Sequence, residues 1–325
     1  MIVPQFWAES RLQHRARGRQ VTVRRFGWSD TSLADAQQSA DVRVKQALDR
    51  ILSGEKLARI DPKIPYNGAA GVPIREEIVD RQGETIITRN SYGARCLNTP
   101  NVLFADIDFP NGQPLRFTAA FMLTLLLLSG AAAWLSGSRA VGIGLVVLTL
   151  LLGFALVSPV FRLVQAAAGG AEQAARKRIA AFVARHPDWN LRVYKTPAGL
   201  RVAATHRLFQ PNEPAVAEFF AALGTDPLYV AMCLNQQCFR ARLTAKPWRI
   251  GIQSPMRPRP GVWPVAADRL PLRNAWIADY EAAAKSHAAC SFLESVGNGV
   301  VHLEARDVLD LHDTLSQARG GLPIA

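Results

Sequence analysis

The chain has 325 residues, of which 38 are Lys or Arg and 26 are Asp or Glu, so its formal net charge is +12 at pH 7. This length fits one large domain or two small ones, and the charge favours anionic partners: nucleic acid, nucleotides or an anionic membrane leaflet. The four cysteines form no CxxC pair and no Cys/His cluster of zinc spacing. This pattern argues against a zinc or redox motif and predicts reduced thiols in a cytosolic compartment.

The N-terminus has no basic segment followed by an apolar core, so no signal peptide is expected. Residues 20–26 alternate like a strand, and residues 29–32 offer an N-cap for a helix from about 33 to 52. Arginines interleaved with aromatic residues can bind a phosphate backbone and stack on bases, and a solvated basic edge is the alternative. The basic residues of this segment are Arg11, His14, Arg15, Arg17, Arg19, Arg24 and Arg25.

Residues 62–71 are rich in Pro, Gly and Asn and are predicted to form a loop. Residues 75–80 and 84–89 then read as a β-hairpin. The apolar run 101–109 carries Asp106 and Asp108 and is stopped by residues 110–112. Because residues two apart in a strand share a face, the two carboxylates would stand side by side, an arrangement that suits Mg²⁺ or Mn²⁺. The alternative is an acidic strand end that caps the following turn.

Two uncharged apolar runs, at about 117–135 and 140–157, are each long enough to cross a bilayer as a helix. They predict a transmembrane hairpin over residues 116–165, between two parts of one α/β domain at 1–115 and 166–325. The outer ends are basic and the turn carries one Arg, so the positive-inside rule places the domain and both termini in the cytoplasm, with the hairpin in the inner membrane. The flanking basic residues are Arg116, Arg162, Arg176, Lys177 and Arg178.

The remaining elements follow the hairpin in a regular order. Helices are expected at 171–184, 214–223, 275–284 and 307–317, and strands at 191–195, 200–205, 238–243 and 300–304. Residues 228–232 fit a strand or a helix, and residues 255–264 form a Pro- and Arg-containing loop.

The acidic strand, the later strand–turn–strand and the Asp-then-basic segment resemble, in this order, the catalytic module of the archaeo-eukaryotic primase superfamily. The resemblance covers roughly residues 75–250 and implies a two-layer α/β (α+β) fold, a primase-like palm with an antiparallel or mixed sheet, interrupted by the hairpin. It implies that Asp106 and Asp108 bind the catalytic metals. Arg95, which precedes them, is a predicted phosphate ligand, as are Thr196, Arg201 and His206.

The second family motif is a Ser-x-His on a turn that enters a strand and contacts phosphate. Here Thr196 and the following turn occupy that place, but Arg201 stands where the family has His, and His206 is five residues further on. The third motif, an Asp before a basic strand, resembles Asp226 and the segment 239–246. The resemblance implies that Asp226 completes the metal site and that triphosphate is held by Arg240, Arg242 and Lys246. A local alternative is that Asp226 caps a surface helix.

This reading implies metal-dependent nucleotidyl transfer, with nucleotide and nucleic acid as ligands, the bilayer as a partner and no protein partner indicated. One rival is a membrane glycosyltransferase that binds a nucleotide-sugar through the same DxD, although the basic N-terminus is unlike that fold. Another is a non-catalytic, membrane-tethered module that binds nucleic acid or nucleotide, which the Arg201 departure favours. A hydrolase is a third rival, but the chain has no GxSxG or HExxH motif to support it. Its candidate residues are His287, His302, His312, Asp307, Asp310 and Asp313.

Overall fold

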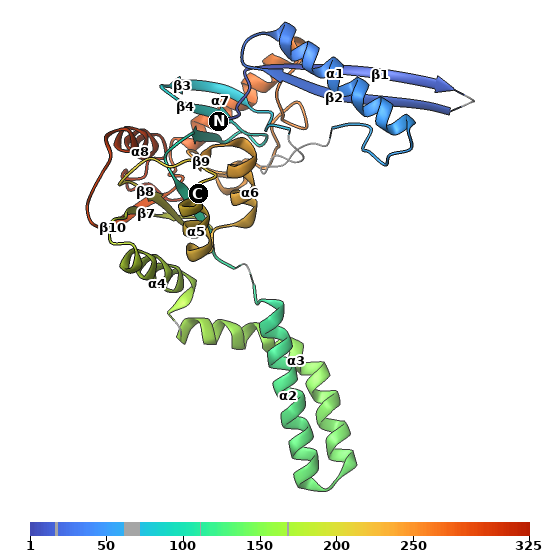
Figure 1. Ribbon diagram of the computed structural model, residues 1–325. Coiled ribbons are helices and arrows are strands. Elements are labelled where there is room, and N and C mark those ends of the chain that lie inside the picture. Colours follow the sequence, from blue (N-terminus) through green and yellow to red (C-terminus); the bar gives the residue numbers. More distant parts are fainter. Residues whose placement is uncertain (17–18, 62–71, 111, 168) are drawn as a thin grey trace. The chain divides into compact units, whose positions relative to one another are not determined.

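The computed structural model describes residues 1–16, 19–61, 72–110, 112–167 and 169–325, and the predicted loop 62–71 lies outside them. The described chain is a mixed α/β protein with antiparallel strands and eight α-helices (Figure 1). It divides into two compact units: Met1–Ile107 with Phe182–Pro197 and Arg201–Ala325, and Asp108–Ala181 with Ala198–Leu200. All four cysteines are free and buried.

The first unit begins with a β-ribbon backed by a helix. Strands β1 (Phe6–Ala16) and β2 (Arg19–Ser29) pair antiparallel along their whole length, and α1 (Leu33–Leu52) lies across one face of the ribbon (Figure 1). The predicted N-cap is confirmed, because the Ser32 side chain accepts from the backbone N–H of Asp35. Alternate ribbon residues, among them Ala8 and Val23, pack against Ala40 and Val44 of the helix.

A four-stranded sheet with the order β3-β4-β5-β9 follows. The predicted hairpin is confirmed: β3 (Glu77–Gln82) pairs antiparallel with β4 (Thr85–Arg89) across a turn in which Gly83 has a φ of 57°. Strand β5 (Arg95–Thr99) pairs with β4 and also with β9 (Phe239–Arg242), which comes from far along the chain.

The second four-stranded sheet has the order β10-β7-β8-β6. It contains the acidic strand β6 (Phe104–Asp108), the strands β7 (Asn190–Thr196) and β8 (Gly199–Ala204), and β10 (Ser291–Gly297). Four helices belong to the same part of the chain: α5 (Pro214–Leu223), α6 (Pro227–Gln236), α7 (Leu270–Ala284) and α8 (Leu303–Leu315). Residues 228–232 are therefore helical.

The prediction of a strand at residues 300–304 is wrong. Val300 and Val301 are apolar but exposed, residues 300–302 lie outside any strand, and α8 begins at Leu303. The backbone N–H of His302 donates to the Thr205 carbonyl, which places this segment as the entry to the helix. The late strand of the chain is β10 instead.

The second unit contains α2 (Leu115–Ser136) and α3 (Arg139–Ala167), and α4 (Gly170–Arg185) leads out of it. Helices α2 and α3 contact each other, and each is long and apolar enough to cross a membrane by length and composition. Gly137 ends α2 in the left-handed conformation. Between the helices, the hydroxyls of Ser129 and Thr149 are 2.9 Å apart. Helix α3 runs ten residues beyond the predicted end at 157.

Candidate functional site at the acidic strand

Asp106 of β6 is held by Arg201 of the neighbouring strand β8. The Arg201 Nε donates to Asp106 Oδ1 at 2.8 Å and one terminal nitrogen donates to Oδ2 at 3.2 Å. The Arg201 side chain is 3% exposed and that of Asp106 is 27% exposed. Burial by itself lowers the pKa of the guanidinium, but the charge and hydrogen bonds of Asp106 outweigh it and raise the pKa. Both carboxylate oxygens of Asp106 are thus bound by a permanently charged group.

The other two predicted metal ligands have different surroundings. Asp108 is the exposed last residue of β6. Asp226 is the N-cap of α6, where its side chain accepts from the backbone N–H of Leu228 at 3.2 Å, and the capping alternative is confirmed. The Asp226 backbone N–H donates to the Asp106 carbonyl at 3.0 Å, so the two residues are neighbours. Over the described residues, no three His, Cys, Asp or Glu side chains are grouped as a metal site would require.

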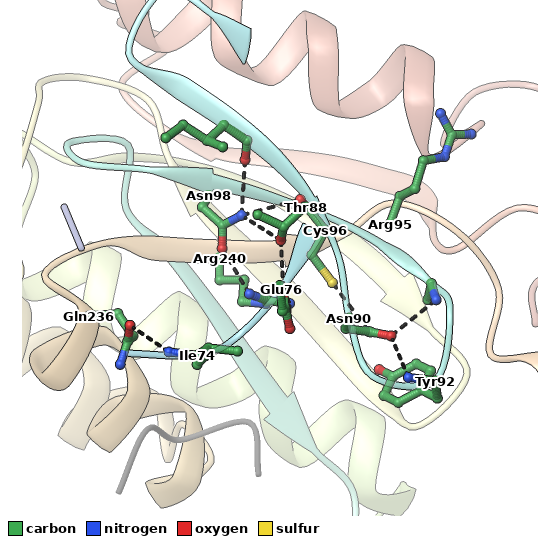
Figure 2. A network of polar contacts seen from close by, with 12 residues as sticks. Ile74, Glu76, Thr88, Asn90, Tyr92, Arg95, Cys96, Asn98, Gln236 and Arg240 are labelled. Atoms are coloured by element: carbon green, nitrogen blue, oxygen red, sulfur yellow. Dashed lines mark hydrogen bonds and ion pairs between the residues drawn. The ribbon is translucent and has the colours of Figure 1, made fainter. Parts of the chain in front are cut away.

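Arg240 lies inside a buried polar network rather than at an open surface (Figure 2). Its guanidinium donates to both carboxylate oxygens of Glu76, at 2.8 and 2.7 Å, and to the Asn98 amide oxygen at 2.9 Å. Arg240 is 4% exposed and Glu76 is 6% exposed. The Thr88 hydroxyl donates to Glu76 at 2.6 Å and accepts from Asn98 at 3.0 Å. The guanidinium therefore neutralises an internal carboxylate between β3, β4, β5 and β9.

The other predicted phosphate ligands are distributed over several environments. The Arg95 side chain points away from the Glu76–Arg240 contact (Figure 2), and its Nε lies 3.3 Å from a carboxylate oxygen of Glu281 in α7. His206 packs on aromatic rings, accepts from a backbone N–H through Nδ1, and has a pKa lowered by burial. Thr196 is buried at the end of β7, the Arg242 carbonyl accepts from Arg201, and the Lys246 amine lies 5.5 Å from the ring of Trp248.

His312 and Asp313, two of the hydrolase candidates, belong to a buried cluster behind Arg201, and sequence reasoning missed their grouping with Cys290 and Arg201. A terminal nitrogen of Arg201 lies 3.3 Å from His312 Nε2, and His312 Nδ1 lies 3.0 Å from Asp313 Oδ1. The Cys290 sulfur is 3.8 Å from the same Nε2. Since a guanidinium only donates, the contact with Arg201 fits the tautomer in which Nε2 accepts and the imidazole proton lies on Nδ1, facing Asp313. His312 and Cys290 are both 0% exposed, so solvent-borne substrates do not reach this cluster.

The cluster positions Arg201 from behind and makes stability depend on pH. Burial raises the pKa of Asp313, but hydrogen bonds from His312, Tyr194 and Arg319 outweigh it and hold that pKa below its usual value. A depressed carboxyl pKa contributes stability that is present above the unfolded-state value, about 3.9, and is lost as pH falls through the folded-state value.

We therefore expect Asp313→Asn to lower the melting temperature at neutral pH, and the gap to the unmodified protein to narrow below about pH 4. Melting curves of both proteins from pH 7 to pH 3, followed by tryptophan fluorescence, measure this. Asp307→Asn, on the exposed side of α8, is the matched control and should follow the unmodified protein. A difference in melting temperature between the two proteins that stays constant down to pH 3 would contradict the assignment of this pH-dependent stability to Asp313.

No family model matches the chain, and no curated protein and no solved structure matches it either.

Proposed function

We propose that the chain is a membrane-anchored module that binds nucleic acid or nucleotide without metal-dependent nucleotidyl transfer. The observation that carries this proposal is the bidentate pair between Arg201 and Asp106. A divalent cation at Asp106 would have to displace a buried guanidinium and leave its charge without a counterion, which is costly. Where the primase superfamily carries a His that faces phosphate, this chain carries an Arg that is bound to the acidic strand.

The anionic class of ligand follows from charge. The net charge of +12 attracts polyanions. Anchoring is assigned to α2 and α3, which meet the length and composition of membrane-spanning helices. Basic residues lie at the outer ends of this hairpin, whereas the turn carries only Arg139. The positive-inside rule then places the α/β domain on the cytoplasmic side of the inner membrane.

A metal-dependent nucleotidyltransferase of primase type is the second candidate. It is favoured by the hydrogen bond from the Asp226 backbone to the Asp106 carbonyl, which brings two of the three predicted acidic ligands next to each other. In that function Mg²⁺ or Mn²⁺ would lie on Asp106, Asp108 and Asp226 and would hold a nucleoside triphosphate.

One experiment separates the two candidates. The melting temperature of the detergent-solubilised protein is measured with Mn²⁺, with each nucleoside triphosphate or nucleotide-sugar, and with both together. We expect no increase in melting temperature that requires Mn²⁺ and nucleotide together. We also expect the protein to bind nucleic acid with an affinity that falls steeply as the salt concentration rises. Arg201→His frees the Asp106 carboxylate and should gain a Mn²⁺-dependent shift, whereas the double variant with Asp106→Asn should not.

A shift in the unmodified protein that requires both Mn²⁺ and a nucleoside triphosphate, and that Asp106→Asn abolishes, would replace the proposal with the transferase. A Mn²⁺-dependent shift of the melting temperature that appears with nucleotide-sugars but not with nucleoside triphosphates would point to the glycosyltransferase. Absence of nucleic-acid and nucleotide binding at low salt would overturn the binding function itself.

A further inference from the structure

The N-terminal ribbon has one face buried by α1 and one polar, basic face. Alternation along the strands and the register of β1 with β2 place alternate residues on the side away from α1. We call the outer half of this side the ribbon face; it consists of Arg11, Gln13, Arg15, Gln20, Thr22 and Arg24. Arg11 pairs with Arg24, Gln13 with Thr22, and Arg15 with Gln20, so every position carries a hydrogen-bonding side chain.

Charge is concentrated on the ribbon and not on the helix behind it. Of the arginines of β1 and β2, Arg11, Arg15 and Arg24 lie on the ribbon face by register, whereas Arg25 is buried on the other side beside Asp61. The one acidic residue of the two strands, Glu9, forms an ion pair with Arg24. Helix α1 carries three acidic and three basic residues and is neutral. Arg11, Gln13, Arg15 and Gln20 are exposed. Such a basic, polar face complements a polyanion.

The aromatic residues of the ribbon lie outside the ribbon face and pack against other side chains. They lie at its other end, where Trp7 is 5% exposed and the Phe26 ring is covered by the Arg75 guanidinium at 3.6 Å. The Trp28 ring lies under Arg43 at 4.6 Å. Proteins that bind single strands rely on exposed aromatic platforms, and membrane-surface elements need apolar anchors beside their basic residues. The ribbon face contains neither, which favours a duplex.

We propose that the ribbon face binds double-stranded DNA in the major groove. The major groove of B-DNA, about 12 Å wide, admits a two-stranded ribbon, whereas the deep, narrow major groove of RNA duplexes does not. Arg and Gln side chains read guanine and adenine edges there, and Thr contacts either base edge or phosphate. Helix α1 stiffens the ribbon from behind. This inference rests on the proposed nucleic-acid-binding function and names its surface and its ligand.

The test uses the full chain in nanodiscs of neutral lipid and a fluorescent DNA duplex of about two helical turns. We expect Arg11→Ala/Arg15→Ala to weaken duplex binding at least about tenfold. The slope of log affinity against log salt should fall by about 2, because two positive charges that displace counterions from the DNA are lost. Lys45→Ala/Arg50→Ala removes the same charge from exposed positions on α1 and should stay within about twofold of the unmodified protein.

Arg11→Lys/Arg15→Lys keeps the charge and should keep the salt slope while losing sequence preference, since Lys does not bind guanine with the Arg fork. Duplex binding that is unchanged in the Arg11→Ala/Arg15→Ala variant would show that the ribbon face is not the DNA-binding surface. It would not contradict the proposed nucleic-acid-binding function. Tighter binding of the separated single strand, or an Arg11- and Arg15-dependent binding of anionic-lipid vesicles in place of duplex, overturns the inference. Failure to bind any nucleic acid or nucleotide overturns the proposed function as well.

Discussion

Glu76→Gln is expected to lower the free energy of unfolding by about 3–5 kcal/mol, because it leaves the Arg240 guanidinium charged and uncompensated inside the protein. Both side chains are almost fully buried, and Glu76 accepts two hydrogen bonds from Arg240 and one from Thr88. Chemical denaturation of the detergent-solubilised protein, followed by tryptophan fluorescence, measures the loss. The expectation treats Arg240 as the internal counterion of Glu76 rather than as a phosphate ligand.

Two further variants make this prediction specific. Glu76→Met/Arg240→Met removes both charges and should recover most of the stability, because an apolar pair of similar volume pays no penalty for burying ions. Arg50→Ala, which breaks an exposed pair with Glu55, should leave the unfolding curve unchanged. A Glu76→Gln protein as stable as the unmodified one would show that the Arg240 charge finds solvent or another anion, and would return Arg240 to the phosphate-binding candidates.

The sequence predicted those elements whose determinants are local. Ser32 and the apolar period behind it specify α1, and the turn at Gly83 specifies the first hairpin. Uninterrupted apolar composition likewise specifies α2 and α3. In each case the residues that decide the structure are within a few positions of each other. The strand predicted at residues 300–304 failed because β-branched residues there are exposed on a connection and bury nothing.

The site depends on pairings that no local pattern reveals. Asp106 and Arg201 are 95 positions apart, and Glu76 and Arg240 are 164 positions apart. From the sequence, an arginine near an acidic strand predicts a phosphate ligand as readily as an internal ion pair. Which of the two it becomes depends on whether the sheet places a carboxylate beside it. For Arg201 the neighbouring strand β6 supplies that carboxylate, and for Arg240 the segment just before β3 supplies it. This long-range arrangement decides the chemistry.

Gly27→Ala is expected to destabilise the ribbon–helix unit by about 3 kcal/mol through overpacking. A Cβ at this position would lie far inside van der Waals distance of the backbone of Ala36 and Ala40 in α1, and backbone atoms cannot rotate away as a side chain can. The glycine is needed for this close approach, since its φ is not in the left-handed region. Helix α1 must therefore move off β2 or the strand must bend.

Amide hydrogen exchange locates the effect. Exchange in α1 should accelerate in Gly27→Ala while exchange in α8 stays unchanged, because the clash is confined to the contact between β2 and α1. Gly320→Ala is the matched control: its added methyl would meet the end of the flexible Gln317 side chain at 3.2 Å, which can turn aside. Unchanged protection of α1 would mean that the helix does not rest on Gly27. A loss of α1 protection accompanied by weaker duplex binding, with Arg11 and Arg15 intact, would show that the helix is what holds the ribbon in its binding shape.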